Sequence, residues 1–115
     1  MLPISERLQN QDNAGILIVN CNRKIVGFTP NLLRIWNLPE VIIKSLSDQL
    51  ALEFVSDQFD NPQLFLKEMT EIYEQRNLVI KGKVQLKDGR IIQRHSKPLC
   101  FNGVYAGRLW MFERN

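Results

Sequence analysis

The segment that most constrains the fold is the last apolar stretch, Arg-Leu-Trp-Met-Phe at residues 108–112. Side chains alternate between the two faces of a strand, so Leu109 and Met111 point to one face. Trp110 and Phe112 point to the other. Both faces are apolar and both need cover, which predicts that this strand lies in the middle of a sheet. The pattern leaves open which of its two faces meets the helices.

Two turn signals join this stretch to earlier strands. The first is Lys-Asp-Gly-Arg at residues 87–90, where Asp tolerates left-handed backbone and Gly adopts a positive φ without steric cost. The second contains the Asn102-Gly103 pair, which is typical of tight hairpins. Before the first turn, apolar residues alternate with Lys81, Lys83 and Gln85. This alternation is typical of a strand with one wet face near a sheet edge, so the three segments predict an antiparallel meander.

A second hairpin is predicted near the start of the chain. Residues 16–19 read Ile-Leu-Ile-Val, and the polar residues 20–23 turn the chain into a return strand at residues 24–28. The strand at 16–20 is apolar on both faces, as is the strand at 108–112. These two strands are therefore the natural central neighbours of one sheet.

Three helices are predicted between the hairpin units. Thr29, followed by a proline at the first helical position, starts a helix that ends before Pro39. Ser47 caps a second helix, with Asp48 in its first turn beside the positive end of the helix dipole. Asn61 caps a third helix.

The apolar residues of these helices predict which faces are buried. On the second helix, Leu50 and Phe54 are expected to face inward, with Ala51 and Val55 beside them. On the third, apolar residues recur at helical spacing: Phe65, Met69, Ile72 and Tyr73. Residues 41–43, Val-Ile-Ile, form a short apolar stretch without a firm assignment.

These patterns predict one α+β domain over residues 15–115, a length suited to a single hydrophobic core. Its five-stranded antiparallel sheet carries about three helices packed on one face. Residues 1–14 are interpreted as an N-terminal flanking helix or connector, in which Ile4 and Leu8 lie one helical turn apart. The N-terminus lacks the layout of a signal peptide and no apolar run is long enough to cross a bilayer, so we expect a cytoplasmic domain without membrane contact.

Charge and cysteine content argue against several classes of site. The net charge of +3 is mild, and the basic residues of the C-terminal strands are interpreted as solvated strand faces, without a nucleic-acid surface. These residues are Lys81, Lys83, Lys87, Arg90, Arg94, Lys97 and Arg108. The single histidine, His95, argues against a metal site of the usual ligand set. Cys21 and Cys100 are expected to be free thiols, with a redox switch between them kept as a minor alternative.

The order of these motifs resembles that of a PAS domain. The opening hairpin at residues 15–28, the helix ending Trp36-Asn37-Leu38-Pro39 and the closing segments (87–90, Ser96-x-Pro98 and 103–112) each have a counterpart in that family. The resemblance implies a profilin-like sheet of order 2-1-5-4-3. The sequence departs from the family pattern at Glu113-Arg114-Asn115, where relatives usually carry Asp-(Ile/Val)-Thr before an output helix.

The resemblance also implies a function. Residues 60–66, Asp-Asn-Pro-Gln-Leu-Phe-Leu, resemble those of PAS domains in bacterial sensor histidine kinases, which are transferases of two-component systems. It implies a signal-input domain with an output domain after Asn115 and parallel homodimerisation. The candidate interface residues are Ile4, Leu8, Leu109 and Met111. An input domain of a diguanylate cyclase or another multidomain regulator is the alternative, and a small stand-alone enzyme is a weaker one.

No catalytic residues and no cofactor are predicted. His95 shares its strand face with Ile91, Gln93 and Lys97, and no acidic residue is placed to orient it. Haem is disfavoured because the predicted helices contain no histidine; a non-covalent flavin or a small apolar ligand stays as an alternative. Such a ligand would lie between helices and sheet, among some of the candidate lining residues Phe28, Trp36, Phe54, Phe65, Met69 and Trp110. The favoured interpretation is that these side chains simply fill the core.

Overall fold

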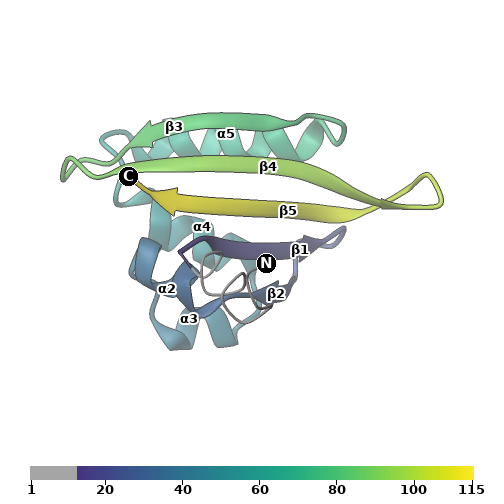
Figure 1. Cartoon of the computed structure of the whole chain (residues 1–115), viewed down its shortest axis with the longest axis horizontal. Helices are drawn as coiled ribbons and strands as arrows, with labels where there is room; N and C mark the ends of the chain where they lie inside the picture. Colours follow the sequence, from purple (N-terminus) through teal and green to yellow (C-terminus); the bar gives the residue numbers. More distant parts are fainter. Residues whose placement is uncertain (1–12) are drawn as a thin grey trace, which may run out of the picture.

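The chain folds into one antiparallel sheet with helices on one side (Figure 1). This computed structural model describes residues 13–115. The strands are β1 (Gly15–Asn20), β2 (Ile25–Phe28), β3 (Ile80–Gln85), β4 (Ile91–Phe101) and β5 (Val104–Arg114). Their order across the sheet is β2-β1-β5-β4-β3. The predicted central pair is confirmed, because β1 and β5 are neighbours and Leu17 lies opposite Trp110.

Four helices occur within the described residues. They are α2 (Pro30–Trp36), α3 (Glu40–Lys44), α4 (Asp48–Ser56) and α5 (Pro62–Glu74). Helix α3 contains the apolar stretch that the sequence left unassigned; its first turn follows Pro39, and it buries Ile43. The prediction of about three helices therefore missed one short helix, because five residues are too few for a helical periodicity to stand out.

Predicted caps and turns are largely confirmed. The Ser47 hydroxyl accepts a hydrogen bond from the Leu50 N–H at 3.2 Å, and the Asn61 side chain accepts one from the Leu64 N–H at 3.1 Å. Thr29 precedes α2 but uses its hydroxyl differently. The hydroxyl accepts a hydrogen bond from the Ile16 N–H at 3.0 Å. It therefore connects the start of β1 to the start of α2 and does not cap the helix.

The tight hairpin between β4 and β5 also follows its sequence. Asn102 and Gly103 both have positive φ, at 51° and 79°. This is the backbone that a two-residue hairpin turn of the twisted type requires, and Asn and Gly adopt it most readily. The turn sets the pairing of Phe101 with Val104, and a shift in register between Leu99 and Cys100 then places Trp110 opposite Ser96.

The core lies between the helices and one face of the sheet. Trp110 and Phe112 of β5 are buried on the helix side, at 1% and 9% exposure, while Leu109 and Met111 lie half-exposed on the outer face. This arrangement answers the question that alternation left open. The middle strand is covered on its inner face by the helices, and its outer face is apolar and half-exposed.

Helix α4 is oriented differently from the prediction. Leu50 is 47% exposed, whereas Ala51 and Val55 are buried. Phe54 is only partly buried, where it packs against the outside of the core. The expectation that Leu50 faces inward is therefore wrong, and the reason is Asp48, whose own burial turns the helix.

Among residues 13–115, the structure contains no helix that combines the length and the apolar character needed to cross a membrane. The proposed flanking helix, with Ile4 and Leu8, falls almost entirely outside the described residues.

Glycine at position 107 is required by the close pairing of β5 with β1. A Cβ atom there would lie 2.0 Å from the Val19 carbonyl oxygen and 2.8 Å from the Asn20 Cα, both backbone atoms. We expect Gly107→Ala to lower the free energy of unfolding by about 2 kcal/mol or more, because the two strands must separate. Urea denaturation measures this loss. Gly82→Ala is the matched control, since a Cβ there meets nothing within 4 Å; an equal loss in both variants would contradict the explanation.

Candidate functional site

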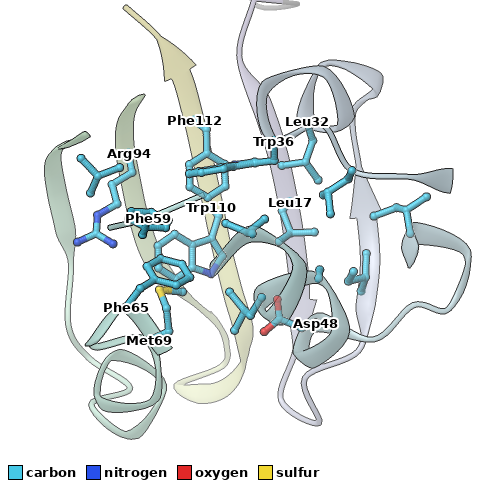
Figure 2. A pocket seen from close by; sticks show the side chains of 17 residues that line it. Leu17, Leu32, Trp36, Asp48, Phe59, Phe65, Met69, Arg94, Trp110 and Phe112 are labelled. Atoms are coloured by element: carbon cyan, nitrogen blue, oxygen red, sulfur yellow. The ribbon is translucent and has the colours of Figure 1, made fainter. Parts of the chain in front are cut away.

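A small apolar cavity lies between the helices and the sheet (Figure 2). Its volume is about 40 Å³. A single water needs roughly 10–15 Å³ by this kind of measure, and the pockets of drug-sized ligands measure several hundred Å³. Side chains therefore occupy most of the space between the layers, and the cavity that remains has room for only a few small atoms.

Four of the six predicted lining residues surround this cavity. Trp36 of α2, Phe65 and Met69 of α5 and Trp110 of β5 all contribute to its wall. The structure brings these four side chains together, because each lies on the inward face of its own element.

Phe28 and Phe54 do not line the cavity. Phe28 lies on β2, the edge strand, and is 42% exposed because no further strand covers it. Phe54 packs against the outside of the core cluster, as described above. An aromatic side chain at the edge of a layer does not reach its middle.

The sequence missed Phe59, which closes the cavity from the loop between α4 and α5. Its ring stacks on Phe65, with centroids 4.1 Å apart, and lies 6.1 Å from Trp36. Phe112 adds an edge-to-face contact with Trp36 at 5.2 Å. Loop residues carry no periodicity, so only the presence of an aromatic within a polar turn could have drawn attention to Phe59.

The wall also contains one buried carboxylate, that of Asp48. Asp48 begins α4 and is 1% exposed. Its Oδ2 accepts two hydrogen bonds from Arg23, from Nη2 at 3.0 Å and from Nε at 3.2 Å. Burial raises the pKa of this carboxyl above its ordinary value, and the Arg23 charge opposes that rise. Asp48 is thus a buried ion-pair partner as well as a residue of the first helical turn.

Tyr73 connects this ion pair to the central strand. Its hydroxyl accepts a hydrogen bond from the Trp110 Nε1–H at 3.1 Å, and the Arg23 guanidinium lies 4.1 Å above the centre of its ring. Burial, and then the nearby Asp48 carboxylate, raise the pKa of Tyr73 far above its ordinary value, so the phenol stays protonated. Four elements meet in this polar cluster: the β1–β2 turn, α4, α5 and β5.

Three arginines of the C-terminal strands and the turn before β4 are not solvated, contrary to the prediction. Arg94 projects toward α5 and forms an ion pair with Glu68, with its side chain 13% exposed. Arg90, 15% exposed, donates to the Ile35 carbonyl at 3.0 Å and to Gln58 Oε1 at 2.7 Å. Each spans the gap between the sheet and the helix layer, which strand alternation does not reveal.

Arg108 is the most deeply buried of the three, with 0% exposure. Its guanidinium donates to Ser96 Oγ at 2.9 Å, to the Leu78 carbonyl at 2.8 Å and to the Arg76 carbonyl at 3.3 Å. Its Nε has no partner among the described residues. The interpretation of Arg108 as a solvated strand residue was wrong, because residue 108 shares the inner face with Trp110.

His95 and the two thiols do not line the core cavity, although Cys21 lies in the same β1–β2 turn as Arg23. His95 is half-exposed on the outer face of the sheet, where it pairs with Lys81 on one side and Met111 on the other. Cys21 and Cys100 are free and exposed. Among residues 13–115, no group of three or more His, Cys, Asp or Glu side chains could hold a metal ion.

The outer face of the sheet has an apolar half and a cationic half. In the apolar half, Ile16 pairs with Met111 and Ile18 pairs with Leu109, and all four side chains are half-exposed. The neighbouring strands carry the cationic half, formed by Lys81, Lys83 and Lys97. We call the group of Ile16, Ile18, Leu109 and Met111 the outer apolar patch.

Solved structures share this architecture. The sensor region of a sensor histidine kinase aligns with a TM-score of 0.65 and 11% identity over 87% of this chain, which spans 38% of that region. The PAS domain of BvgS from Bordetella pertussis aligns with a TM-score of 0.64 and 14% identity, over 96% of this chain and 87% of that one. The N-terminal domain of a diguanylate cyclase with a PAS/PAC sensor, from Marinobacter aquaeolei, aligns with a TM-score of 0.57 and 12% identity, over 86% of this chain and 91% of that one.

No protein-family model matches the sequence, and no curated protein matches it. At 11–14% identity the solved structures establish the fold alone. The chain has the fold of PAS domains, and the sheet order that the resemblance implied is confirmed.

The burial of Asp48 predicts a specific pH dependence of stability. Its pKa is raised in the folded protein, so between its ordinary value of 3.8 and the raised value the folded state binds more protons than the unfolded state. The stability of the wild type relative to Asp48→Asn should therefore fall as pH rises through this window, and level off above it. Urea denaturation of both proteins from pH 3 to pH 7 measures the difference. A relative gain of the wild type with rising pH would show that the Arg23 pair outweighs burial.

Proposed function

We propose that this domain is a signal-input module of a larger regulatory protein. It responds to a change at its core and passes that change on through the outer face of its sheet. The fold supports this role, because solved structures that share it include sensor regions of histidine kinases and a diguanylate cyclase. A sensor histidine kinase is the parent we favour, and a diguanylate cyclase is the second candidate.

The outer apolar patch is the observation that carries the proposal. Its four side chains lie on the two central strands of the sheet and are contiguous, because Ile16 and Ile18 pair directly with Met111 and Leu109. An apolar patch at the middle of a sheet is typical of a surface that is covered by a partner. We propose that a second copy of this chain provides the cover, and that the module acts as a homodimer.

The same two strands connect the core to this surface. β5 presents Trp110 to the cavity and Met111 to the outer face, and β1 presents Leu17 and Ile18 in the same way. A change in the packing of Trp110 therefore shifts backbone that also forms the outer apolar patch. Densely packed cores move between discrete arrangements instead of deforming continuously, which suits a two-state signal.

We propose that the domain itself transmits state without catalysis and without a resident cofactor. The cavity of about 40 Å³ is too small for a flavin unless the helices move apart. A small apolar molecule suits the apolar lining of the cavity better than a flavin does. A cytoplasmic location is part of the proposal, supported by two free, exposed thiols that a reducing compartment would maintain.

Leu109→Glu should weaken the dimer at least about tenfold, because it places a carboxylate inside an apolar interface. The monomer should tolerate the change, since residue 109 lies directly opposite Lys97 on β4. Sedimentation equilibrium over a range of concentrations measures the dissociation constant.

Val41→Glu is the matched control, because Val41 is 75% exposed on α3, in the helix layer. It should leave the dimer unchanged. A wild-type chain that stays monomeric at millimolar concentration would contradict dimerisation through this surface. The coding sequence that follows Asn115 separately decides between the two parent types, since a kinase requires a phosphoacceptor histidine and an ATPase domain.

A further inference from the structure

A second concavity lies on the surface, where the β1–β2 turn, the end of α5 and β5 meet. Its volume is about 460 Å³, within the range of small-molecule sites. The residues that carry its chemistry come from all three segments: Asn20, Arg23, Tyr73, Glu74, Arg76 and Tyr105. We call this concavity the arginine–tyrosine cleft; it is separate from the core cavity and from the outer apolar patch.

Two arginines in the cleft are each stacked on a tyrosine. The Arg23 guanidinium lies 4.1 Å above the Tyr73 ring centre, and the Arg76 guanidinium lies 4.6 Å above that of Tyr105. Stacking occupies the flat face of a guanidinium and leaves the N–H groups at its edge available. It also restricts the rotamers of a long side chain, so less entropy is lost when a ligand binds.

Several donors in the cleft are not used by other described residues. Arg23 donates to Asp48 through Nε and Nη2, so the N–H groups of Nη1 stay available for a ligand. The Arg76 side chain forms no hydrogen bond or ion pair within residues 13–115. Asn20 accepts from the Asn22 and Lys24 N–H groups through Oδ1, at 2.9 and 3.0 Å, so its amide N–H groups stay available.

Buried side chains fix the segments that form the cleft. The buried Arg108 guanidinium donates to the Arg76 carbonyl at 3.3 Å, which fixes the segment that carries Arg76. Asp48 fixes Arg23 in the same manner. The donors are thus positioned by buried groups, as a binding site requires.

We propose that the arginine–tyrosine cleft binds a small anionic ligand through a carboxylate or phosphate group. A guanidinium edge matches the two oxygens of either group, and the pair forms short, charge-assisted hydrogen bonds. Glu74 is the one exposed carboxylate on the lining, and its charge opposes this ligand. Glu74 therefore distinguishes the proposal from a zwitterionic ligand, whose ammonium group Glu74 would attract.

The test is a titration of the whole ¹⁵N-labelled chain, with inorganic phosphate or succinate as the probe and NaCl holding the ionic strength constant. We expect saturable shifts of the Arg76 Nε–H and Asn20 side-chain amide signals with at least one probe. A response to phosphate alone identifies a phosphate-bearing ligand, and a response to succinate identifies a carboxylate. Shifts that rise without saturation for both probes would show screening only, and would overturn the proposal.

Arg76→Gln should weaken binding about tenfold or more, because a charge-assisted contact is lost. Arg76→Lys should restore part of it, since the charge returns without the planar edge. The matched control is Lys67→Gln, which removes the same charge from an exposed position on α5, outside the cleft. Equal weakening in Arg76→Gln and Lys67→Gln would overturn the proposal.

Glu74→Gln should strengthen binding several-fold, because a like charge is removed from the cleft. Weaker binding of these anionic probes in this variant would overturn the assignment of the cleft to an anion. The Leu109→Glu variant should bind the probe with wild-type affinity. The cleft and the dimer therefore succeed or fail independently.

Discussion

The buried guanidinium of Arg108 determines how the sheet and the longest described helix fit together. A charge without a counter-ion is costly to bury, and here three neutral oxygens compensate it: one hydroxyl on β4 and two carbonyls just beyond the end of α5. Those carbonyls lie at the negative end of the helix dipole, which favours a cation. The arrangement stabilises one position of α5 on the sheet, because any other position would leave the charge and the carbonyls unpaired. The wall of the core cavity and the wall of the arginine–tyrosine cleft both depend on that position.

The polar groups inside this domain form connections between layers. Arg94 reaches Glu68 on α5, Arg90 reaches the end of α2, and Trp110 reaches Tyr73. Apolar packing alone fills space in many nearly equivalent ways, whereas a buried hydrogen bond tolerates few geometries. A core with several such bonds therefore has few alternative arrangements. A ligand or a partner that binds one of them better shifts the equilibrium between them. This property suits the signal-input module proposed above.

The sequence predicted the sheet better than the contacts across it. Alternation at residues 108–112 and 16–20 identified the central strands, and the turn at Asn102-Gly103 identified the β4–β5 hairpin, because both signals are local. Arg108 was misinterpreted because alternation assigns a residue to a face but does not say which atoms lie above it. Asp48 was read only through the helix dipole, although a partner 25 residues earlier decides its burial. Such pairings depend on the tertiary fold, and one sequence carries no local trace of them.

Arg23 belongs to two sites at once, and this has a consequence for how they act on each other. Its Nε and Nη2 donate to Asp48 on the wall of the core cavity, while the same side chain lines the arginine–tyrosine cleft. If an anion binds in the cleft as proposed, it shares the charge that stabilises the Asp48 carboxylate, and we expect the pKa of Asp48 to rise further. Linkage is reciprocal: if the anion favours the protonated carboxyl, protonation of Asp48 favours the anion by the same factor. A surface ligand can thus change the charge of the core without entering it, through one side chain that touches both.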